Sequence, residues 1–361
     1  MEIQVWFDQL WAVEFESSKV DRYMTENFDR SEVRGFDIYE AELAVGIDAV
    51  RQAMSVCQFV QSQVTPEALE KRDKSPVTIA DYASQAVICR SLSLAFPGDP
   101  IVAEEDSTSL RQTEQKAFLT QIEHELQRVG INGTTDDICR WIDQGNAQSY
   151  CNRFWTLDPI DGTKGFLRGE QYAVSLALIV EGLPTVAVLG CPNLSADGQA
   201  GVIFSAVSGR GAMYQLADGE QSPQPVRVRE TPDMEQSRFC ESVESGHSKH
   251  DWSARIAEEL GIVADPVRMD SQAKYAAVAR GEADIYLRLP TRPGYLEKIW
   301  DHAGGVLVVQ EAGGTVTDIN GQPLDFTHGI ELVENQGVVV TTGRHHDQVI
   351  AAIQQTRAES E

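Results

Sequence analysis

Hydrophobic residues recur at helical spacing in the first part of the chain. A long helical pattern covers residues 40–64, and Pro66 begins a break after it. A second helix is predicted soon afterwards, with Thr78 as its N-cap. Its apolar face follows the spacing i, i+3, i+4, i+7 and consists of Ile79, Tyr82, Ala83 and Ala86. Residues 113–129 also have a helical pattern and could form a flap over a site.

Shorter apolar runs predict β-strands. The runs 100–103 and 154–157 stop abruptly at acidic residues, as buried strands do when their C-terminal ends line a site. Three further runs, at 172–180, 185–190 and 202–207, predict an antiparallel meander. After about residue 225, strand and helix patterns alternate as in a second α/β layer. The chain is therefore expected to form two αβ domains that share a cleft.

The predicted organisation has three parts, which are an extension at 1–39, an α+β domain at 40–222 and an α/β domain at 223–361. The extension carries aromatic residues among acids, which suits either a helix packed on the body or a partner-binding arm. Near residue 301 an almost wholly apolar segment predicts a buried helix, although its β-branched residues leave a strand open. Gly313 and Gly314 would end this helix, and Thr315 would begin the next strand.

Composition and charge restrict the partners. With 361 residues, 42% of them hydrophobic, the chain can bury a substantial core. The 30 basic and 55 acidic residues give a formal charge of −25, so we expect neither a nucleic acid nor an anionic membrane as partner. Residues 268–298, with six basic and four acidic residues, are a local exception. This stretch could receive an anionic substrate or could be a solvated helix face.

Cysteine usage and the lack of targeting patterns predict a cytoplasmic protein. The six cysteines are scattered without zinc-site spacing, which fits free thiols in a reducing compartment. No apolar run approaches the roughly 20 residues of a membrane helix, and the N-terminus lacks the order of a signal peptide. A transit peptide would be poor in acid, whereas residues 1–40 hold ten acidic and four basic residues. We expect a monomer, with an oligomer left open.

Two carboxylates three residues apart are the most informative feature. The predicted strand at 154–157 delivers Asp158 and Asp161 into a glycine-containing turn. Nearby carboxylates repel each other unless a cation lies between them, so the turn suits a hard metal ion. The alternative is an ordinary Asx turn, because Asp, Pro and Gly favour turns for backbone reasons alone.

Other acidic residues favour the metal site over the Asx turn. Glu104 and Glu105 end the 100–103 strand, and Asp301 begins the predicted buried helix. Asp81, near the start of the second helix, is a further candidate. Carboxylates converging from several element ends match the oxygen ligands that Mg²⁺ prefers. No Cys or Ser stands in a catalytic motif, so we expect water to attack the substrate directly, with His302 packed beside Asp301.

These motifs resemble, in order over residues 40–345, the signature of the inositol monophosphatase superfamily. The matching strings are Glu104-Glu105, Asp158-Pro159-Ile160-Asp161-Gly162-Thr163, Trp300-Asp301-His302-Ala303-Gly304-Gly305 and Ser75-Pro76-Val77-Thr78-Ile79-Ala80-Asp81-Tyr82. The resemblance implies an α/β (α+β) fold, a two-domain layered αβαβα sandwich of the inositol monophosphatase or sugar phosphatase type. It also implies inhibition by Li⁺.

A narrower resemblance is to the 3'(2'),5'-bisphosphate nucleotidases of that superfamily. It rests on residues 162–169, 242–247, 270–275, 284–290 and 297–301. It implies a small nucleotide as substrate, namely adenosine 3',5'-bisphosphate, whose 3'-phosphate is hydrolysed. Use of 3'-phosphoadenosine 5'-phosphosulfate is left open.

The resemblance also assigns roles to residues. Two or three Mg²⁺ ions would bind Glu104, Asp158, Asp161, Asp301 and the Ile160 carbonyl, while Asp81 and Thr163 would align the attacking water. The nucleotide would be held by Gly162, Thr163, His247, Ser271, Lys274 and Arg288. Lys274 and Arg288 lie in the locally basic stretch, where a phosphate that is kept needs cationic donors. Each also has an ordinary alternative, as a solvated lysine or a structural ion pair.

Two rival functions remain. An inositol polyphosphate 1-phosphatase, acting on inositol 1,4-bisphosphate, would use the same metal site, although the strings at 270–275 and 284–290 favour the nucleotide. A non-catalytic nucleotide sensor would have at least one broken catalytic position, and the sequence has none. Binding of structural Ca²⁺ by the acidic turns is a third alternative.

Overall fold

The structure, a computed structural model, describes residues 38–64, 75–112, 115–231, 233–243, 250–290, 292 and 294–358. Ala41–Glu361 forms one compact unit, which contains both sheets and all the helices described below. The predictions for residues 1–37 and for His247 lie outside the described residues.

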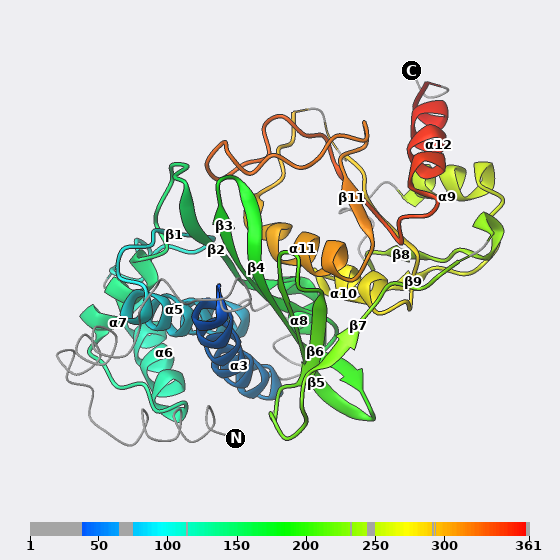
Figure 1. The fold of residues 1–361 in the computed structure, drawn as a ribbon. Coiled ribbons are helices and arrows are strands. Elements are labelled where there is room, and N and C mark those ends of the chain that lie inside the picture. Colours follow the sequence, from blue (N-terminus) through cyan, green and yellow to red (C-terminus); the bar gives the residue numbers. More distant parts are fainter. Residues whose placement is uncertain are drawn as a thin grey trace. The chain divides into compact units, whose positions relative to one another are not determined.

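The first sheet has seven strands in sequence order. They are β1 (Ile101–Ala103), β2 (Arg153–Asp161), β3 (Ala173–Val180), β4 (Leu183–Ala196), β5 (Gln199–Val207), β6 (Ala212–Leu216) and β7 (Gln224–Val226). β1 pairs parallel with β2, and every later pair is antiparallel. The predicted strands and the antiparallel meander are therefore confirmed (Figure 1).

Helices from the N-terminal half cover one face of this sheet. They are α3 (Glu40–Ser62) and α5 (Ser75–Ala95), with α6 (Lys116–Arg128) and α7 (Thr135–Asp143) packed on α5. Gly46 of α3 lies so close to β4 that a Cβ atom there would be 3.2 Å from Val188 Cγ2. The helix predicted at 113–129 is confirmed in α6, whereas its role as a flap stays a prediction.

The predicted N-cap of the second helix is wrong. α5 begins at Ser75, so Thr78 lies inside the helix. Pro76 is compatible with the first turn of a helix, because an N–H group there has no intrahelical acceptor to lose. The proline is therefore compatible with a helix that begins four residues before Ile79, the first residue of the predicted apolar face.

The second sheet has five strands in the order β11-β12-β10-β8-β9. The elements of this half are β8 (Phe239–Glu241), α9 (His250–Glu259), β9 (Val267–Arg268), α10 (Ala273–Ala279), β10 (Ile285–Arg288), α11 (Ala303–Glu311), β11 (Thr315–Thr317), β12 (Val338–Thr341) and α12 (His346–Ala358). The predicted alternation of strands and helices is confirmed, as are the helix after Asp301 and the strand that begins at Thr315.

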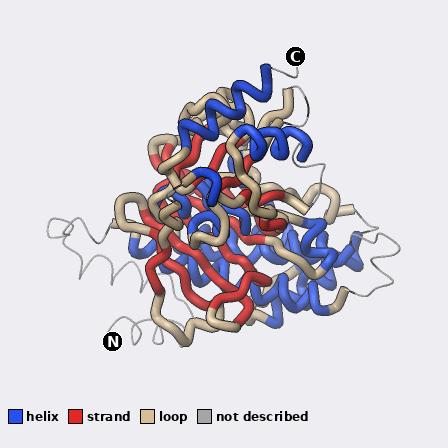
Figure 2. Tube along the Cα trace, turned by 90° about the vertical axis from the view of Figure 1, so that its right-hand side faces the viewer, coloured by secondary structure: helices blue, strands red, loops and turns tan. Residues whose placement is uncertain are grey.

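Two helices lie between the sheets. α10 packs on β4 and on β8, β10 and β12, while α11 packs on β3 to β6 and on β11. Because α11 meets both sheets, it is buried continuously from Ala303 to Val309, which explains its apolar sequence. α9 and α12 pack on each other beside the second sheet, through a core that includes Trp252, Ile256 and Ile353. Figure 2 shows the strands between helices, and the layered αβαβα fold is confirmed.

The domain boundary at 222–223 stays a prediction, because both sheets belong to the same compact unit. All six cysteines are free. Among the described residues, no helix is long and apolar enough to span a membrane.

Candidate active site

The ends of β1 and β2 place two predicted metal ligands side by side. In this parallel pair Ala103 is opposite Leu157, so Glu104 and Asp158 follow at the same edge of the sheet. The two carboxyl groups interact electrostatically with each other. Asp158 is buried, whereas Glu104 is exposed and reaches solvent.

An irregularity at the end of β2 brings in the next two predicted ligands. The register between β2 and β3 shifts between Asp158 and Asp161, which places Pro159 and Ile160 in a bulge. Ser84 of α5 donates a hydrogen bond to the Pro159 carbonyl at 3.0 Å and so fixes the bulge to the helix. The bulge therefore contains Ile160, whose carbonyl is a predicted ligand.

Asp301 is the fourth predicted carboxylate ligand, and it comes from the C-terminal half of the chain. It is the last residue of the short 3₁₀ helix η4 (Ile299–Asp301). Its carboxyl interacts electrostatically with those of Asp161 and Glu104. The four carboxylates predicted as metal ligands thus converge from three elements.

This crowding changes the proton affinities of the carboxyls. Burial raises the pKa of Asp158 well above its usual value, and Glu104, Asp161 and Asp301 raise it further. Partial withdrawal from water, with repulsion from Glu105 and Asp161, raises the pKa of Glu104 to about 7. Burial and Asp161 raise the pKa of Asp301 to about 7, against the opposing effects of His302 and Arg288. Each shift arises first from burial and then from neighbouring negative charge, and a bound cation would offset both effects.

The donor set fits divalent metal ions. Among the described residues, Asp158 Oδ1 and Asp81 Oδ1 are buried oxygens that accept no hydrogen bond. Glu104, Asp161 and Asp301 are not fully buried, so solvent and ligands can reach them. Carboxylate oxygens are the ligands that hard cations such as Mg²⁺ prefer.

A second grouping consists of Glu297, Asp301 and His302, whose ligand atoms all lie within 4.8 Å of one another. These residues already have internal partners. Arg288 Nη2 lies 3.1 Å from Glu297 Oε2 and 3.7 Å from Asp301 Oδ2. His302 lies between Tyr275 and Glu297, with Nδ1 2.7 Å from the Tyr275 hydroxyl and Nε2 3.3 Å from Glu297 Oε2. The guanidinium supplies the positive charge here, so this grouping is a structural network beside the carboxylate cluster.

Asp81 and Thr163, predicted to align the water, lie on two helices that pack on each other. Asp81 is buried in α5, and Thr163 is the exposed first residue of α8 (Thr163–Arg168). Burial raises the pKa of Asp81, and repulsion from Glu105 and Glu104 adds to the effect.

The loop before α8 touches the turn that precedes α10. Gly162 has φ = 90°, and a Cβ atom there would lie 2.8 Å from Ser271 Cβ, so a side chain is excluded on both grounds. Ser271 itself has φ = 69°, a conformation that few non-glycine residues adopt. The predicted metal loop and the predicted nucleotide-binding residues are thus packed against each other.

Lys274 is buried on α10, close to this contact. Its Nζ donates a hydrogen bond to the Ser271 carbonyl at 2.8 Å and lies 5.1 Å from the centre of the Tyr286 ring. Burial lowers the pKa of Lys274, while Asp161 raises it. The lysine is therefore a buried donor facing the cluster, and the alternative of a solvated lysine is wrong.

Arg288 ends β10 and is part of an ion pair. Its Nε and Nη2 contact the two Glu297 oxygens at 3.2 and 3.1 Å. Burial alone would raise the pKa of Glu297, but hydrogen bonding to His302 and the charge of Arg288 lower it to about 2. Arginine has five N–H donors, so this pairing leaves donors for a second anion.

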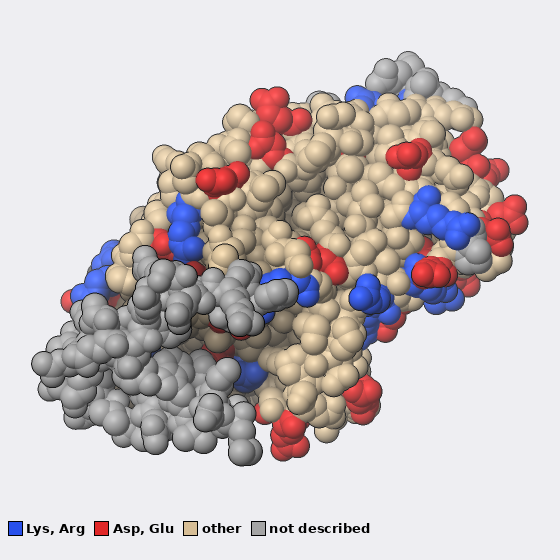
Figure 3. Space-filling view, viewed as in Figure 1, with Lys and Arg blue, Asp and Glu red and all other residues tan. Residues whose placement is uncertain are grey.

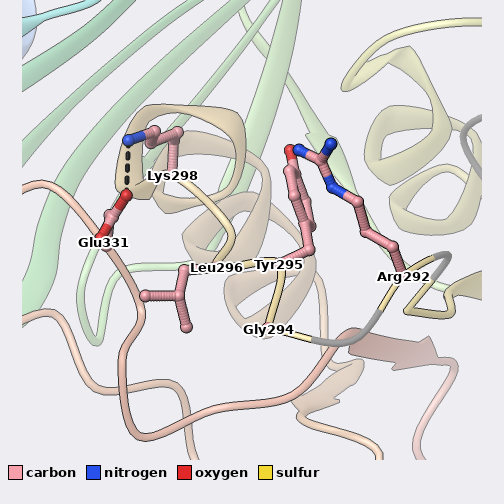
Figure 4. Close-up of a pocket in the computed structure, with 6 residues that line it drawn as sticks. All are labelled: Arg292, Gly294, Tyr295, Leu296, Lys298 and Glu331. Carbon is pink, nitrogen blue, oxygen red and sulfur yellow. Dashed lines mark hydrogen bonds and ion pairs between the residues drawn. The ribbon is translucent and has the colours of Figure 1, made fainter.

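A hollow of about 530 Å³ lies near Arg288. It is lined by Arg292, Gly294, Tyr295, Leu296, Lys298 and Glu331 (Figure 4). One wall is the ion pair of Lys298 and Glu331, at 2.7 Å, and opposite it the Arg292 guanidinium lies 4.9 Å from the Tyr295 ring centre. Burial raises the pKa of Tyr295, with contributions from Glu297 and Asp301 and an opposing one from Arg288. These interactions place the hollow beside the Arg288 end of the site.

Three supporting residues were missed by the sequence analysis. Gln85 accepts a hydrogen bond from Glu105 N at 3.0 Å, Gln272 N donates to Asp161 Oδ2 at 2.5 Å, and Glu297 holds Arg288. Buried glutamines have no spacing that marks them in a sequence. The sequence marks two of the three residues only by their place in the motifs. Gln272 lies within the string 270–275, and Glu297 lies within the string 297–301.

The layered fold and the carboxylate cluster together define a class of metal-dependent phosphatases. The sequence profile of the Inositol monophosphatase family matches residues 30–358. The chain therefore belongs to the inositol monophosphatase family, which is metal-dependent.

Several relatives match over nearly their full length. A 3'(2'),5'-bisphosphate nucleotidase of Schizosaccharomyces pombe is 46% identical, with 87% of this chain and 95% of the relative covered. Proteins of the same name from Emericella nidulans and Oryza sativa are each 42% identical, with 87% and 88% of this chain and 98% and 94% of the relatives covered.

Solved structures support the fold. An inositol monophosphatase from Anabaena has a TM-score of 0.55 at 23% identity, covering 87% of this chain and 95% of its own. CysQ from Bacteroides thetaiotaomicron, a bacterial member of the inositol monophosphatase family, has a TM-score of 0.59 at 20% identity, covering 85% and 99%.

Proposed function

We propose that this protein is a phosphatase that hydrolyses the 3'-phosphate of adenosine 3',5'-bisphosphate, giving AMP and inorganic phosphate, with Mg²⁺ as cofactor. The observation that carries the proposal is the position of Arg288, 3.7 Å from the carboxylate of Asp301. A cation directly beside a cluster of metal-binding carboxylates suits a substrate with one phosphate to be cleaved and another to be kept. The relatives named 3'(2'),5'-bisphosphate nucleotidase support the choice of substrate.

In this proposal the Glu104, Asp158, Asp161 and Asp301 carboxylates and the Ile160 carbonyl would hold two or three Mg²⁺ ions. The bound ions would neutralise the scissile phosphate and lower the pKa of the attacking water. The chain supplies ligands from β1, β2 and η4, so the geometry depends on how these three elements are held together.

Asp81 and Thr163 are proposed to orient the water and accept its proton. A carboxylate that is buried near Glu104 and Glu105 has a raised affinity for protons, which suits a base. The water oxygen forms a bond to phosphorus as the bond from phosphorus to the 3'-oxygen breaks. A second water protonates the departing 3'-oxygen, and the hydroxide left behind takes up the proton that Asp81 accepted. The N–H groups of Gly162 and Thr163 would bind oxygens of the transferred phosphate.

The retained 5'-phosphate is assigned to Arg288, Lys274 and Ser271. Lys274 interacts electrostatically with Asp161 and with Arg288, and Arg288 interacts with Asp301, so both cations lie beside the carboxylate cluster. Binding would require Arg288 to share its donors between Glu297 and the phosphate. His247 remains a proposed contact outside the described residues.

Some features of the proposal concern the whole protein. We infer a monomer in the cytoplasm, inhibition by Li⁺, and a free nucleotide as the partner. Figure 3 shows Lys and Arg on the visible face in small groups among acidic side chains, which offers little to a polyanion such as a nucleic acid. Hydrolysis of 3'-phosphoadenosine 5'-phosphosulfate is a further possibility for the same site.

Phosphate release from two substrates tests the proposal. Adenosine 3',5'-bisphosphate and inositol 1,4-bisphosphate are compared with Mg²⁺, with EDTA, and with Mg²⁺ plus Li⁺. We expect rapid release from the nucleotide that requires Mg²⁺ and is inhibited by Li⁺. Release from the inositol substrate alone would make the protein an inositol polyphosphate 1-phosphatase, and release from neither would favour a sensor.

A further inference from the structure

Gln272 links the predicted nucleotide-binding turn to the metal loop through its main chain. Its N–H group donates to Asp161 Oδ2 at 2.5 Å. It follows Ser271, whose Cβ lies against Gly162. The orientation of the Asp161 carboxylate therefore depends on the position of the turn that carries Ser271.

The side chain of Gln272 reaches two further segments. Its Nε2 donates to the Trp300 carbonyl at 2.9 Å. Its Oε1 accepts hydrogen bonds from Ser175 Oγ at 2.9 Å and from Gly305 N at 3.1 Å. The residue is 1% exposed, so these bonds form away from competing water.

The partners of Gln272 lie next to predicted metal ligands. Ser175 on β3 is the cross-strand neighbour of Asp158. Trp300 immediately precedes Asp301 in η4. With the direct bond to Asp161, one glutamine is connected to three of the four predicted carboxylate ligands. The fourth, Glu104, precedes Glu105, whose main-chain N–H is bound by Gln85 instead.

Close packing of α11 makes these bonds possible. A Cβ atom at Gly304 would lie 2.5 Å from Ser175 Oγ, and one at Gly305 would lie 2.4 Å from the Tyr275 ring. Glycine at both positions lets α11 approach β3 and α10 closely enough for the Gln272 amide to bridge them.

We propose that Gln272 is a positioning residue that holds Asp158, Asp161 and Asp301 in one arrangement and ties it to the turn that binds the retained phosphate. The inference rests on the proposed function. An amide fits because the position needs a donor and an acceptor without charge. A carboxylate would place its lone pairs against the Trp300 carbonyl and add negative charge to the cluster.

The test uses Gln272→Met, which keeps the length of the side chain and removes the amide, and Gln272→Glu, which replaces the donor by a second acceptor oxygen and adds negative charge. Gln354→Met is the matched control, because Gln354 Nε2 also donates to a backbone carbonyl, that of Ile319 at 2.8 Å, outside the site. Mn²⁺ affinity is measured calorimetrically without substrate, and kcat and KM are measured with adenosine 3',5'-bisphosphate and Mg²⁺.

We expect Mn²⁺ binding to weaken by about 10- to 100-fold in Gln272→Met, as for other residues that orient metal ligands. The loss should be larger in Gln272→Glu and absent in Gln354→Met, and kcat should fall more than KM rises. A purely structural role would lower the melting temperature and leave Mn²⁺ affinity unchanged, and that result would overturn the proposal.

If both Gln272 variants fail to fold, Ser175→Ala removes a single hydrogen bond to Oε1 and should weaken Mn²⁺ binding to a smaller extent. Unchanged Mn²⁺ affinity in that variant would contradict the inference. A wild-type protein that binds Mn²⁺ but does not hydrolyse the nucleotide would refute the proposed function alone, because the effect of Gln272 on metal affinity could still be measured.

Discussion

Asp161 lies where the predicted metal loop contacts the predicted nucleotide-binding turn, and its carboxylate interacts with residues of both segments. It interacts with Glu104 and Asp301 and accepts a hydrogen bond from Gln272 N. We expect Asp161→Asn to lower kcat by about a thousand-fold, equivalent to about 4 kcal/mol, because an amide is a weaker ligand for a hard cation. Steady-state phosphate release measures the effect.

The matched control is Asp197→Asn. Asp197 is exposed in the turn between β4 and β5 and has φ = 52°, which asparagine tolerates well. The Asp197→Asn variant should have the same kcat as the wild type. Near-normal turnover in Asp161→Asn would remove Asp161 from the metal site.

Arg288 is the residue that should separate the nucleotide from the inositol substrate. Arg288→Ala is expected to raise KM for adenosine 3',5'-bisphosphate by about 30-fold, the equivalent of about 2 kcal/mol, because a charged phosphate loses its partner. KM for inositol 1,4-bisphosphate should change far less.

Arg280→Ala provides the comparison for Arg288→Ala. The Arg280 and Arg288 side chains are equally exposed, at 17%, but Arg280 pairs with Glu282 and with the Ser195 carbonyl. The Arg280→Ala variant should have the same KM as the wild type for each of the two substrates. Equal losses for the two substrates in Arg288→Ala would mean that Arg288 does not bind the 5'-phosphate.

At the scale of elements, the start of α12 contains a buried histidine. His346 Nε2 and Nδ1 lie 2.8 Å from Thr317 Oγ1 and 2.9 Å from Thr341 Oγ1, which ties α12 to β11 and β12. Burial lowers the pKa of His346 from its usual 6.5, against a small opposing effect of Asp347. Its contribution to stability is therefore complete above pH 6.5 and lost as the pH falls below that value.

The difference between the wild type and His346→Gln isolates this contribution. Urea unfolding at several pH values should show the wild type losing its advantage over the variant as the pH falls from 7.5 to 5.5, a range of about two units around the ordinary histidine pKa. A constant difference across this range would show that protonation of His346 is not coupled to folding.

Sequence patterns predicted most helices and strands, but they did not predict features that depend on tertiary contacts. The meander followed from β-rich runs, and the acid-terminated strands at 100–103 and 154–157 located Glu104 and Asp158. The segment after Asp301 was open between helix and strand, because its almost wholly apolar pattern indicates a buried helix whereas its β-branched residues favour a strand. Its contacts with two sheets favour the helix. Gln272 could not be predicted, since its three side-chain partners come from positions between 28 and 97 residues away.

The whole molecule brings carboxylates together from both halves, so metal binding should stabilise the folded state. Mg²⁺ binds the arranged ligands and has little affinity for the unfolded chain. At 100 times its Kd it should add about 2.7 kcal/mol. The melting temperature should therefore rise by several degrees when Mg²⁺ is added at constant ionic strength, as measured by calorimetry.

The stabilisation should be smaller in Asp161→Asn and unchanged in Asp197→Asn. An equal rise in all three proteins would show that Mg²⁺ acts elsewhere on the surface, which carries a formal charge of −25 over the whole chain.

The proposed function depends on one step, in which water attacks the 3'-phosphate of a nucleotide bisphosphate. Turnover of adenosine 3',5'-bisphosphate with Mg²⁺ in ¹⁸O-labelled water, with both products analysed by mass spectrometry, observes this step itself. We expect 5'-AMP without label and inorganic phosphate that carries one ¹⁸O atom. The proposed reaction would be refuted by ¹⁸O label in the AMP, by release of the 5'-phosphate, or by a lack of turnover.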